Sequence, residues 1–146
     1  MEIINRLKDR VSKLTDLPPL FFRLILAVGF YKPATMKLKN FEGIVEWFGS
    51  MGMPLPKLNA FLATGTETLG VILLLLGLAT RLISIPLIIV MIVAITTVHL
   101  GNGFDAGNNG WEIPLYYILM LFSLIVTGPG KFSIDNIIQS RSSKKD

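Results

Sequence analysis

One acidic residue, Glu67, lies inside an otherwise uncharged apolar run that covers residues 58–78. A spanning helix needs about 20 such residues, so this run is long enough to cross a bilayer. At about 1.5 Å per residue, Glu67 lies roughly 13 Å from the start of the run, near the membrane midplane. A carboxylate at that depth is costly unless it is protonated, paired or hydrated. Glu67 is therefore the first candidate for a functional group.

A second group of polar side chains lies near the ends of the apolar runs. His99 is the one histidine of the chain, and with Asp105 and Glu112 it could exchange protons or form a weak metal site. Lys37 and Arg23 stand fourteen residues apart across the first run. The full set of candidate site residues is Glu67, Arg23, His99, Glu112, Lys37, Asp105, Asn102, Asn108 and Asn109.

Each of these candidates also has a purely structural interpretation. Glu67 could be a protonated acid that hydrogen-bonds a neighbouring helix, and Glu112 could stabilise the amino-terminal dipole of the last helix. His99 could be an ordinary interfacial histidine, and Lys37 a snorkelling anchor. The residue types alone leave both interpretations open.

Four continuous apolar runs must position these residues, and they predict spans near 18–36, 58–78, 82–100 and 112–128. Hydrophobic residues make up 51% and charged residues 16% of the chain, which is more apolar than a typical soluble domain. The runs do not alternate between apolar and polar residues, so helices are favoured over β-strands. We predict an all-α, polytopic membrane four-helix bundle that forms a single domain over residues 1–146.

Shorter elements are predicted outside the spans. In 1–17 apolar residues recur at helical spacing with basic residues between them, which indicates an amphipathic helix on the cytoplasmic face. This segment lacks an apolar signal core, so we expect a mature amino terminus. Aromatic residues in 41–49 predict an interfacial helix in the first external loop. We expect a cytoplasmic tail over 129–146, with a polar and disordered end over 140–146.

The distribution of basic residues predicts the orientation. Nine lie in the amino-terminal segment, the turn after the second span and the tail, against three near the first outer loop, so both termini are expected in the cytoplasm. His99, Glu112 and Lys37 then lie at outer ends of spans, whereas Arg23 enters from the inner third and faces the lower side of Glu67. We expect a polar pocket inside the bundle that opens to the periplasm.

Composition excludes several kinds of chemistry. The chain has no cysteine, which excludes disulfides, thiol catalysis and iron–sulfur ligation by its own residues. A single histidine argues against a haem held by two histidines. The basic isoelectric point, about 9.5, is explained by topology and anionic headgroups, and no nucleic-acid-binding motif accompanies it.

An ordered succession of residues also runs through the spans and the loops between them. Its elements are Arg23 and Lys37, Glu67 with Gly70, the turn 76–81, Met91 and Ala94 before His99, Gly103 and Phe104 before Glu112, and the closing segment 128–135. Over residues 20–135 this succession resembles the DoxX family of small four-helix bacterial membrane proteins. The sequences of segments 29–37, 46–52 and 107–110 are similar to those of the HvfX-type subgroup, which is associated with maturation of copper-binding modified peptides.

The resemblance implies an inner-membrane subunit that works beside redox enzymes, in some members linked to quinones or sulfur compounds. We expect a non-catalytic or co-catalytic subunit whose pocket binds a quinone or another hydrophobic redox partner. Protein partners are expected, and a homo-oligomer is compatible with the sequence. One alternative is a small carrier for protons, a metal ion such as copper, or a solute. A second alternative is a scaffold that recruits soluble enzymes. A methionine–histidine copper(I) site around Met51 and Met53 is a weaker possibility, since such loop methionines are common.

Overall fold

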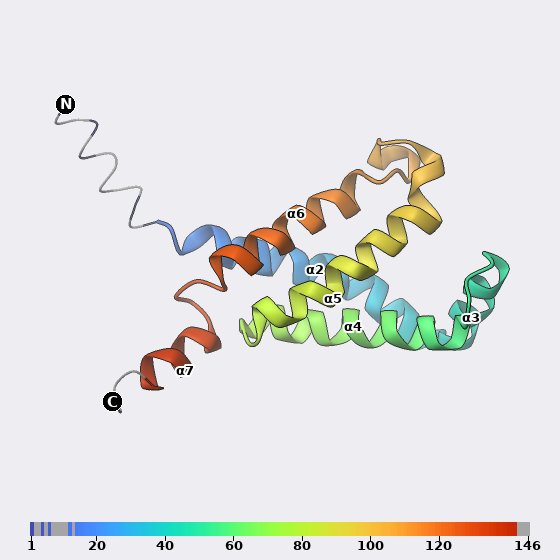
Figure 1. The fold of residues 1–146 in the computed structure, drawn as a ribbon, viewed down its shortest axis with the longest axis horizontal. Coiled ribbons are helices and arrows are strands. Elements are labelled where there is room, and N and C mark those ends of the chain that lie inside the picture. The colour runs from blue at the N-terminus through green and yellow to red at the C-terminus, as the bar shows by residue number, and fades with distance from the viewer. Residues whose placement is uncertain (2–3, 5, 7–11, 13, 143–146) are drawn as a thin grey trace.

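The computed structural model describes residues 1, 4, 6, 12 and 14–142, and within them every regular element is helical (Figure 1). The helices are α2 (Leu17–Lys39), α3 (Phe41–Ser50), α4 (Pro56–Leu76), α5 (Thr80–Ala94), α6 (Glu112–Thr127) and α7 (Ile134–Ser142). The helix predicted over residues 1–17 falls largely on residues outside the described part of the chain.

Four of these helices form a closed bundle. α2 packs against α4, α4 against α5, α5 against α6, and α6 back against α2. Their shared core contains fully buried leucine and phenylalanine side chains from all four helices: Leu26, Phe30, Leu74, Leu87, Leu121 and Leu124. The predicted all-α four-helix bundle is confirmed.

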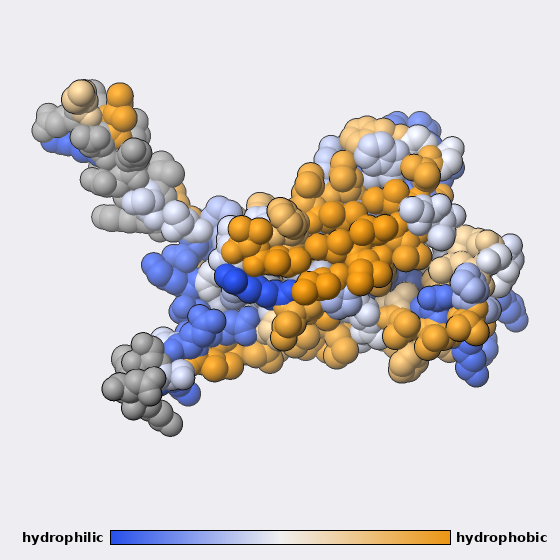
Figure 2. Space-filling view, in the orientation of Figure 1, coloured by the Kyte–Doolittle hydropathy of each residue, from blue (hydrophilic) through white to orange (hydrophobic). Residues whose placement is uncertain are grey.

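The outer surface of the bundle is apolar. Figure 2 shows hydrophobic residues gathered over the middle of the molecule and hydrophilic residues toward its two ends. In the described chain two stretches are long and apolar enough to cross a membrane, α4 and the continuous helical segment Thr80–Asn102, and α6 is a shorter apolar helix. Large exposed hydrophobic side chains on every bundle helix are expected where lipid is the solvent.

The turn between α4 and α5 is fixed by a glycine. Gly77 adopts φ +64, and the N–H groups of Gly77 and Leu78 bond to the carbonyls of Leu74 and Leu73 in a Schellman arrangement. A Cβ on Gly77 would lie 2.6 Å from the Arg23 guanidinium carbon, so this position requires glycine for space as well as for conformation. Asp135 then caps α5 by accepting hydrogen bonds from the N–H groups of Ala79, at 2.8 Å, and Thr80, at 3.1 Å.

Two elements lie outside the bundle at opposite ends (Figure 1). Helix α3 occupies the first loop, as predicted, and packs against α4. Helix α7 lies at the end where α2 begins. It was not predicted, and the expected disorder over 140–146 is wrong for Ser140–Ser142, which continue α7. Ile134, Ile137 and Ile138, spaced i, i+3 and i+4 among polar residues, give this short helix its amphipathic character.

Candidate functional site

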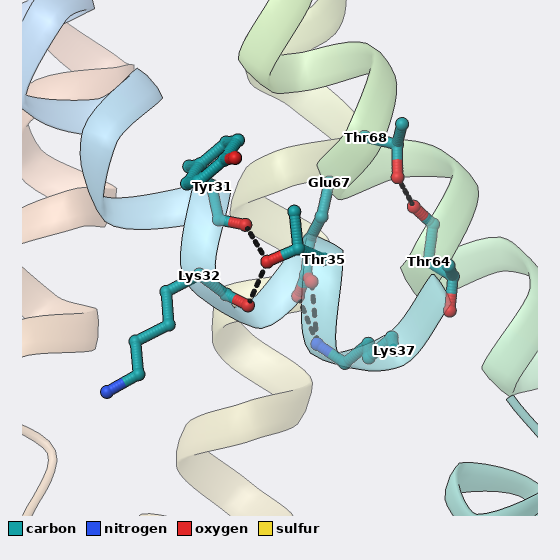
Figure 3. A network of polar contacts seen from close by, with 7 residues as sticks. All are labelled: Tyr31, Lys32, Thr35, Lys37, Thr64, Glu67 and Thr68. Atoms are coloured by element: carbon teal, nitrogen blue, oxygen red, sulfur yellow. Dashed lines mark hydrogen bonds and ion pairs between the residues drawn. The ribbon is translucent and has the colours of Figure 1, made fainter. Parts of the chain in front are cut away.

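An ion pair joins α2 to α4 inside the bundle. Lys37 Nζ lies 2.7 Å and 2.6 Å from the two carboxylate oxygens of Glu67. The side chain of Glu67 is 2% exposed and that of Lys37 is 14% exposed. Figure 3 shows the two side chains facing each other, whereas the nearby Lys32 points away from the pair. Glu67 is therefore held as a paired carboxylate.

The direction of helical side chains explains why these two residues meet. Side chains on an α-helix tilt toward its amino terminus. Helices α2 and α4 run in opposite directions. Lys37, near the end of α2, therefore tilts toward the middle of the bundle, and Glu67, in the middle of α4, tilts toward the end of the bundle next to α3. The interpretation of Lys37 as a snorkelling anchor is wrong, since its ammonium turns into the bundle.

The ion pair lines a cavity of about 530 Å³ in the half of the bundle next to α3. Its polar lining comes from Lys37, Glu67, Asn59, Thr97, His99 and Asn109. Its apolar lining includes the α3 residues Ile44, Trp47 and Phe48, three methionines, and aliphatic residues of α4 and α5. A mostly apolar cavity of this size with a few convergent polar groups is typical of a small-molecule site, for which volumes run from about 300 to 1,000 Å³.

A π-helical turn, Ile95–His99, places the histidine at the rim of this cavity. Such turns are rare in proteins, and those that occur are frequently found at functional sites. His99 Nδ1 lies 2.8 Å from the Asn109 carbonyl oxygen, and since a carbonyl only accepts, Nδ1 carries the proton. The Asn109 carbonyl also accepts from Asn102 Nδ2 at 3.2 Å. His99 Nε2 is thereby left to accept or release a proton.

The other loop candidates hold the loop together and do not line the cavity. Asp105 accepts from the Gly107 N–H and from Asn108 Nδ2. Glu112 accepts from the Ala106 N–H at 3.0 Å and from the hydroxyl of Tyr116 at 2.8 Å, in the first turn of α6. Within the described chain no three histidine, aspartate or glutamate side chains lie close enough to hold a metal ion, so His99, Asp105 and Glu112 do not form the metal set considered from sequence.

Arg23 lies at the opposite end of the bundle, and its predicted position below Glu67 is wrong. The buried guanidinium donates to the carbonyls of Leu74 at 2.9 Å and Leu75 at 3.3 Å, at the end of α4. It also donates to the carbonyls of Pro129 and Phe132 in the segment after α6. Arg23 thus ties three parts of the chain together and has no contact with the cavity.

Comparison with known proteins identifies the family. The DoxX family model matches residues 19–100, more than half of the chain. The chain belongs to the DoxX family. The resemblance found from sequence is confirmed at this level. The matched segment runs from α2 to just beyond His99 and contains every cavity-lining residue except Asn109.

Curated relatives of this DoxX protein extend the similarity over most of its length. A Bacillus subtilis protein named "Putative oxidoreductase CatD" is 31% identical over 130 residues, which cover 88% of this chain and 92% of that one. The Escherichia coli inner membrane protein YphA is 32% identical over 110 residues, 68% of this chain and 74% of YphA. A Haemophilus influenzae protein is 31% identical over 128 residues, with 82% of each chain covered. No solved structure matches the chain significantly.

Sequence reasoning missed the contribution of the first loop to the DoxX cavity. The aromatic residues of 41–49 were interpreted as lying at the membrane interface, yet Trp47 lines the cavity together with Phe48 and Ile44. The signal that could have found them is the apolar face of α3, which repeats at 44, 47 and 48. A short helix with one apolar face, next to a span that carries a polar residue, can cover a site inside the bundle as well as lie at the membrane interface.

Proposed function

We propose that this DoxX protein is a multi-pass subunit of a bacterial inner-membrane redox or peptide-maturation system, with both termini in the cytoplasm. The membrane location is supported by the family and by the apolar bundle surface. The orientation rests on the excess of basic residues at the end where α2 begins and α7 lies. The cavity then lies in the periplasmic half of the bundle.

We further propose that the cavity binds a quinone or a similar hydrophobic redox partner. The observation that carries this proposal is that Lys37, Glu67 and His99 line one mostly apolar cavity. A planar quinone ring can pack against Trp47 and Phe48, while its carbonyl oxygens accept hydrogen bonds from the Lys37 ammonium or from a protonated His99. The cavity volume of about 530 Å³ suits such a ring.

The polar lining can exchange the protons of quinone chemistry. Reduction of a quinone to a quinol consumes two electrons and two protons, and oxidation of the quinol releases them. Glu67 and His99 are the cavity groups able to take or give a proton. The electrons pass to or from a partner oxidoreductase, so this chain acts as a non-catalytic or co-catalytic subunit. The name of the relative CatD, which describes an oxidoreductase, is in keeping with such a setting.

Tryptophan fluorescence offers a direct test. Quinones quench tryptophan emission at short range, and the chain has two tryptophans, of which only Trp47 lines the cavity. Trp111 packs instead on Phe104, with ring centroids 4.8 Å apart. The W111F variant, purified in nanodiscs, is titrated with a benzoquinone and a naphthoquinone that carry no tail. We expect saturable quenching by at least one ring.

The W47F variant is the matched control, because it keeps the fluorophore outside the cavity. Collisional quenching in the bilayer affects both variants and does not saturate. Saturable quenching in W111F that is lost in W111F/K37M/E67Q, in which both charges of the pair are removed together, supports a site at the ion pair. Equal, non-saturating quenching in W111F and W47F would refute quinone binding in this cavity and leave the carrier alternative to be tested by proton flux.

A further inference from the structure

The cavity wall between α4 and α5 reaches the outer surface of the bundle. Leu62 of α4 and Ile89 and Val93 of α5 all line the cavity. The same three side chains are 53%, 56% and 37% exposed. We call these three residues the α4–α5 seam. Exposed residues line the cavity elsewhere too, at Met36, Trp47, Thr97 and Asn109. The seam differs from these in being wholly apolar and in lying between two bundle helices.

The opening begins where α4 and α5 stop packing closely. At Gly70 the helices nearly touch, since a Cβ there would lie 2.9 Å from the Leu87 methyl groups. Farther along, α5 rises away from α4 toward the loop that precedes α6 (Figure 1). The seam lies within this divergent half, on the apolar side surface of the bundle, where acyl chains surround a membrane helix.

From this arrangement we propose that the ligand is a quinone with a long isoprenoid tail that enters sideways from the bilayer through the α4–α5 seam. The inference rests on the proposed function and names the ligand class for the same cavity. The ring lies beside the Lys37–Glu67 pair, and the tail leaves between Leu62 and Val93 into the lipid.

Size and polarity both support a tailed ligand. A cavity of about 530 Å³ holds a ring and the first part of a tail, so the remaining tail must extend outside. The cavity is polar where Lys37 and Glu67 meet and apolar at the seam, which is the polarity of an amphiphile with its head inward. A compact water-soluble ligand would gain no binding energy from an apolar opening that faces lipid, since such a ligand enters a site from water.

The cysteine-free chain allows the seam to be blocked chemically. Leu62→Cys and Val93→Cys are introduced together into the W111F background, and the protein is alkylated with N-cyclohexylmaleimide in nanodiscs of phosphatidylethanolamine and phosphatidylglycerol. The matched control carries Leu75→Cys and Leu82→Cys, which lie on the same two helices, are exposed, and do not line the cavity. Trp47 quenching then reports the affinity for one quinone ring with and without its isoprenoid tail.

We expect alkylation at the seam to weaken binding of the tailed quinone by about tenfold or more and to change binding of the tail-less ring by less than about twofold. Alkylation of the control pair should change neither. Equal loss for both ligands, or no loss for either, would overturn lateral entry, and the second result would also fit a phospholipid chain filling the seam. Absence of ring binding before alkylation would instead refute the proposed function, so the two failures are distinguishable.

Discussion

The Lys37–Glu67 pair makes an asymmetric prediction for the free energy of unfolding. Lys37→Met removes the ammonium and leaves a carboxylate that is 2% exposed without its partner. Removal of one member of a buried ion pair costs about 3–5 kcal/mol, because the remaining charge is uncompensated. Folded proteins are stable by only about 5–15 kcal/mol. K37M should therefore lose a large share of its stability.

The opposite substitution should cost less. Glu67→Gln leaves Lys37 two residues from the end of α2, where its long stem can carry the ammonium toward the interface. We expect a cost of about 1–2 kcal/mol, the range for a lost buried hydrogen bond. K37M/E67Q removes both charges, so it should be more stable than K37M alone. The coupling energy of the cycle should be about 2–3 kcal/mol.

Equilibrium unfolding by SDS in mixed micelles, followed by far-UV circular dichroism, measures all four proteins. Lys32→Met is the matched control, since Lys32 lies on the same helix and points away from Glu67 (Figure 3). It should change the free energy of unfolding by less than about 0.5 kcal/mol. Additive effects of K37M and E67Q, to within about 0.5 kcal/mol, would refute the argument that the two charges hold each other in place.

Two further predictions concern the rest of the bundle. Arg23→Lys should lose at least two of the four hydrogen bonds to carbonyls, because a compact ammonium cannot reach all the acceptors that the wide guanidinium reaches. It should lower the free energy of unfolding by about 2–4 kcal/mol in the same assay. The affinity for quinone should not change. For the topology, a single cysteine at Asn108 should react with a membrane-impermeant maleimide added to intact cells, whereas one at Ser12 should react only in inverted membrane vesicles. Labelling of both from outside would contradict cytoplasmic termini.

The helices of the bundle could be predicted because their signals are local. Continuous apolar runs end at residues with a clear conformational reason, such as Gly77, whose positive φ closes α4. Helix α3 followed from its clustered apolar and aromatic residues. Helix α7 was missed because only three isoleucines, Ile134, Ile137 and Ile138, distinguish it from a polar tail. Contacts such as the capping of α5 by Asp135 are invisible in the sequence of the tail itself.

The partner of Glu67 could not be predicted because it depends on the register of α2 against α4. Arg23 and Lys37 were both available, about 21 Å apart along one helix at 1.5 Å per residue. A tight hairpin would have fixed the register, but α3 and its flanking turns lie between Lys39 and Pro56. The grouping of Asp105 and Glu112 with the pocket failed for a related reason. Both acids accept hydrogen bonds from backbone N–H groups of their own loop, and these local bonds hold their side chains away from the cavity.

Two cations of α2, the buried Arg23 and the partly buried Lys37, perform different tasks, and their residue types fit those tasks. Arg23 meets four carbonyls of fixed position, which suits a rigid, planar group with five donors that stays charged in proteins. Lys37 meets one carboxylate on a cavity wall, and a lysine can swing on its flexible stem and release that partner. A ligand oxygen that takes one ammonium proton in hydrogen bonding frees a Glu67 oxygen to accept a proton. The ion pair thus joins α2 to α4, and under the proposed function it is also a group that a quinone oxygen can rearrange. An arginine at residue 37 would keep the link between the helices and resist that rearrangement.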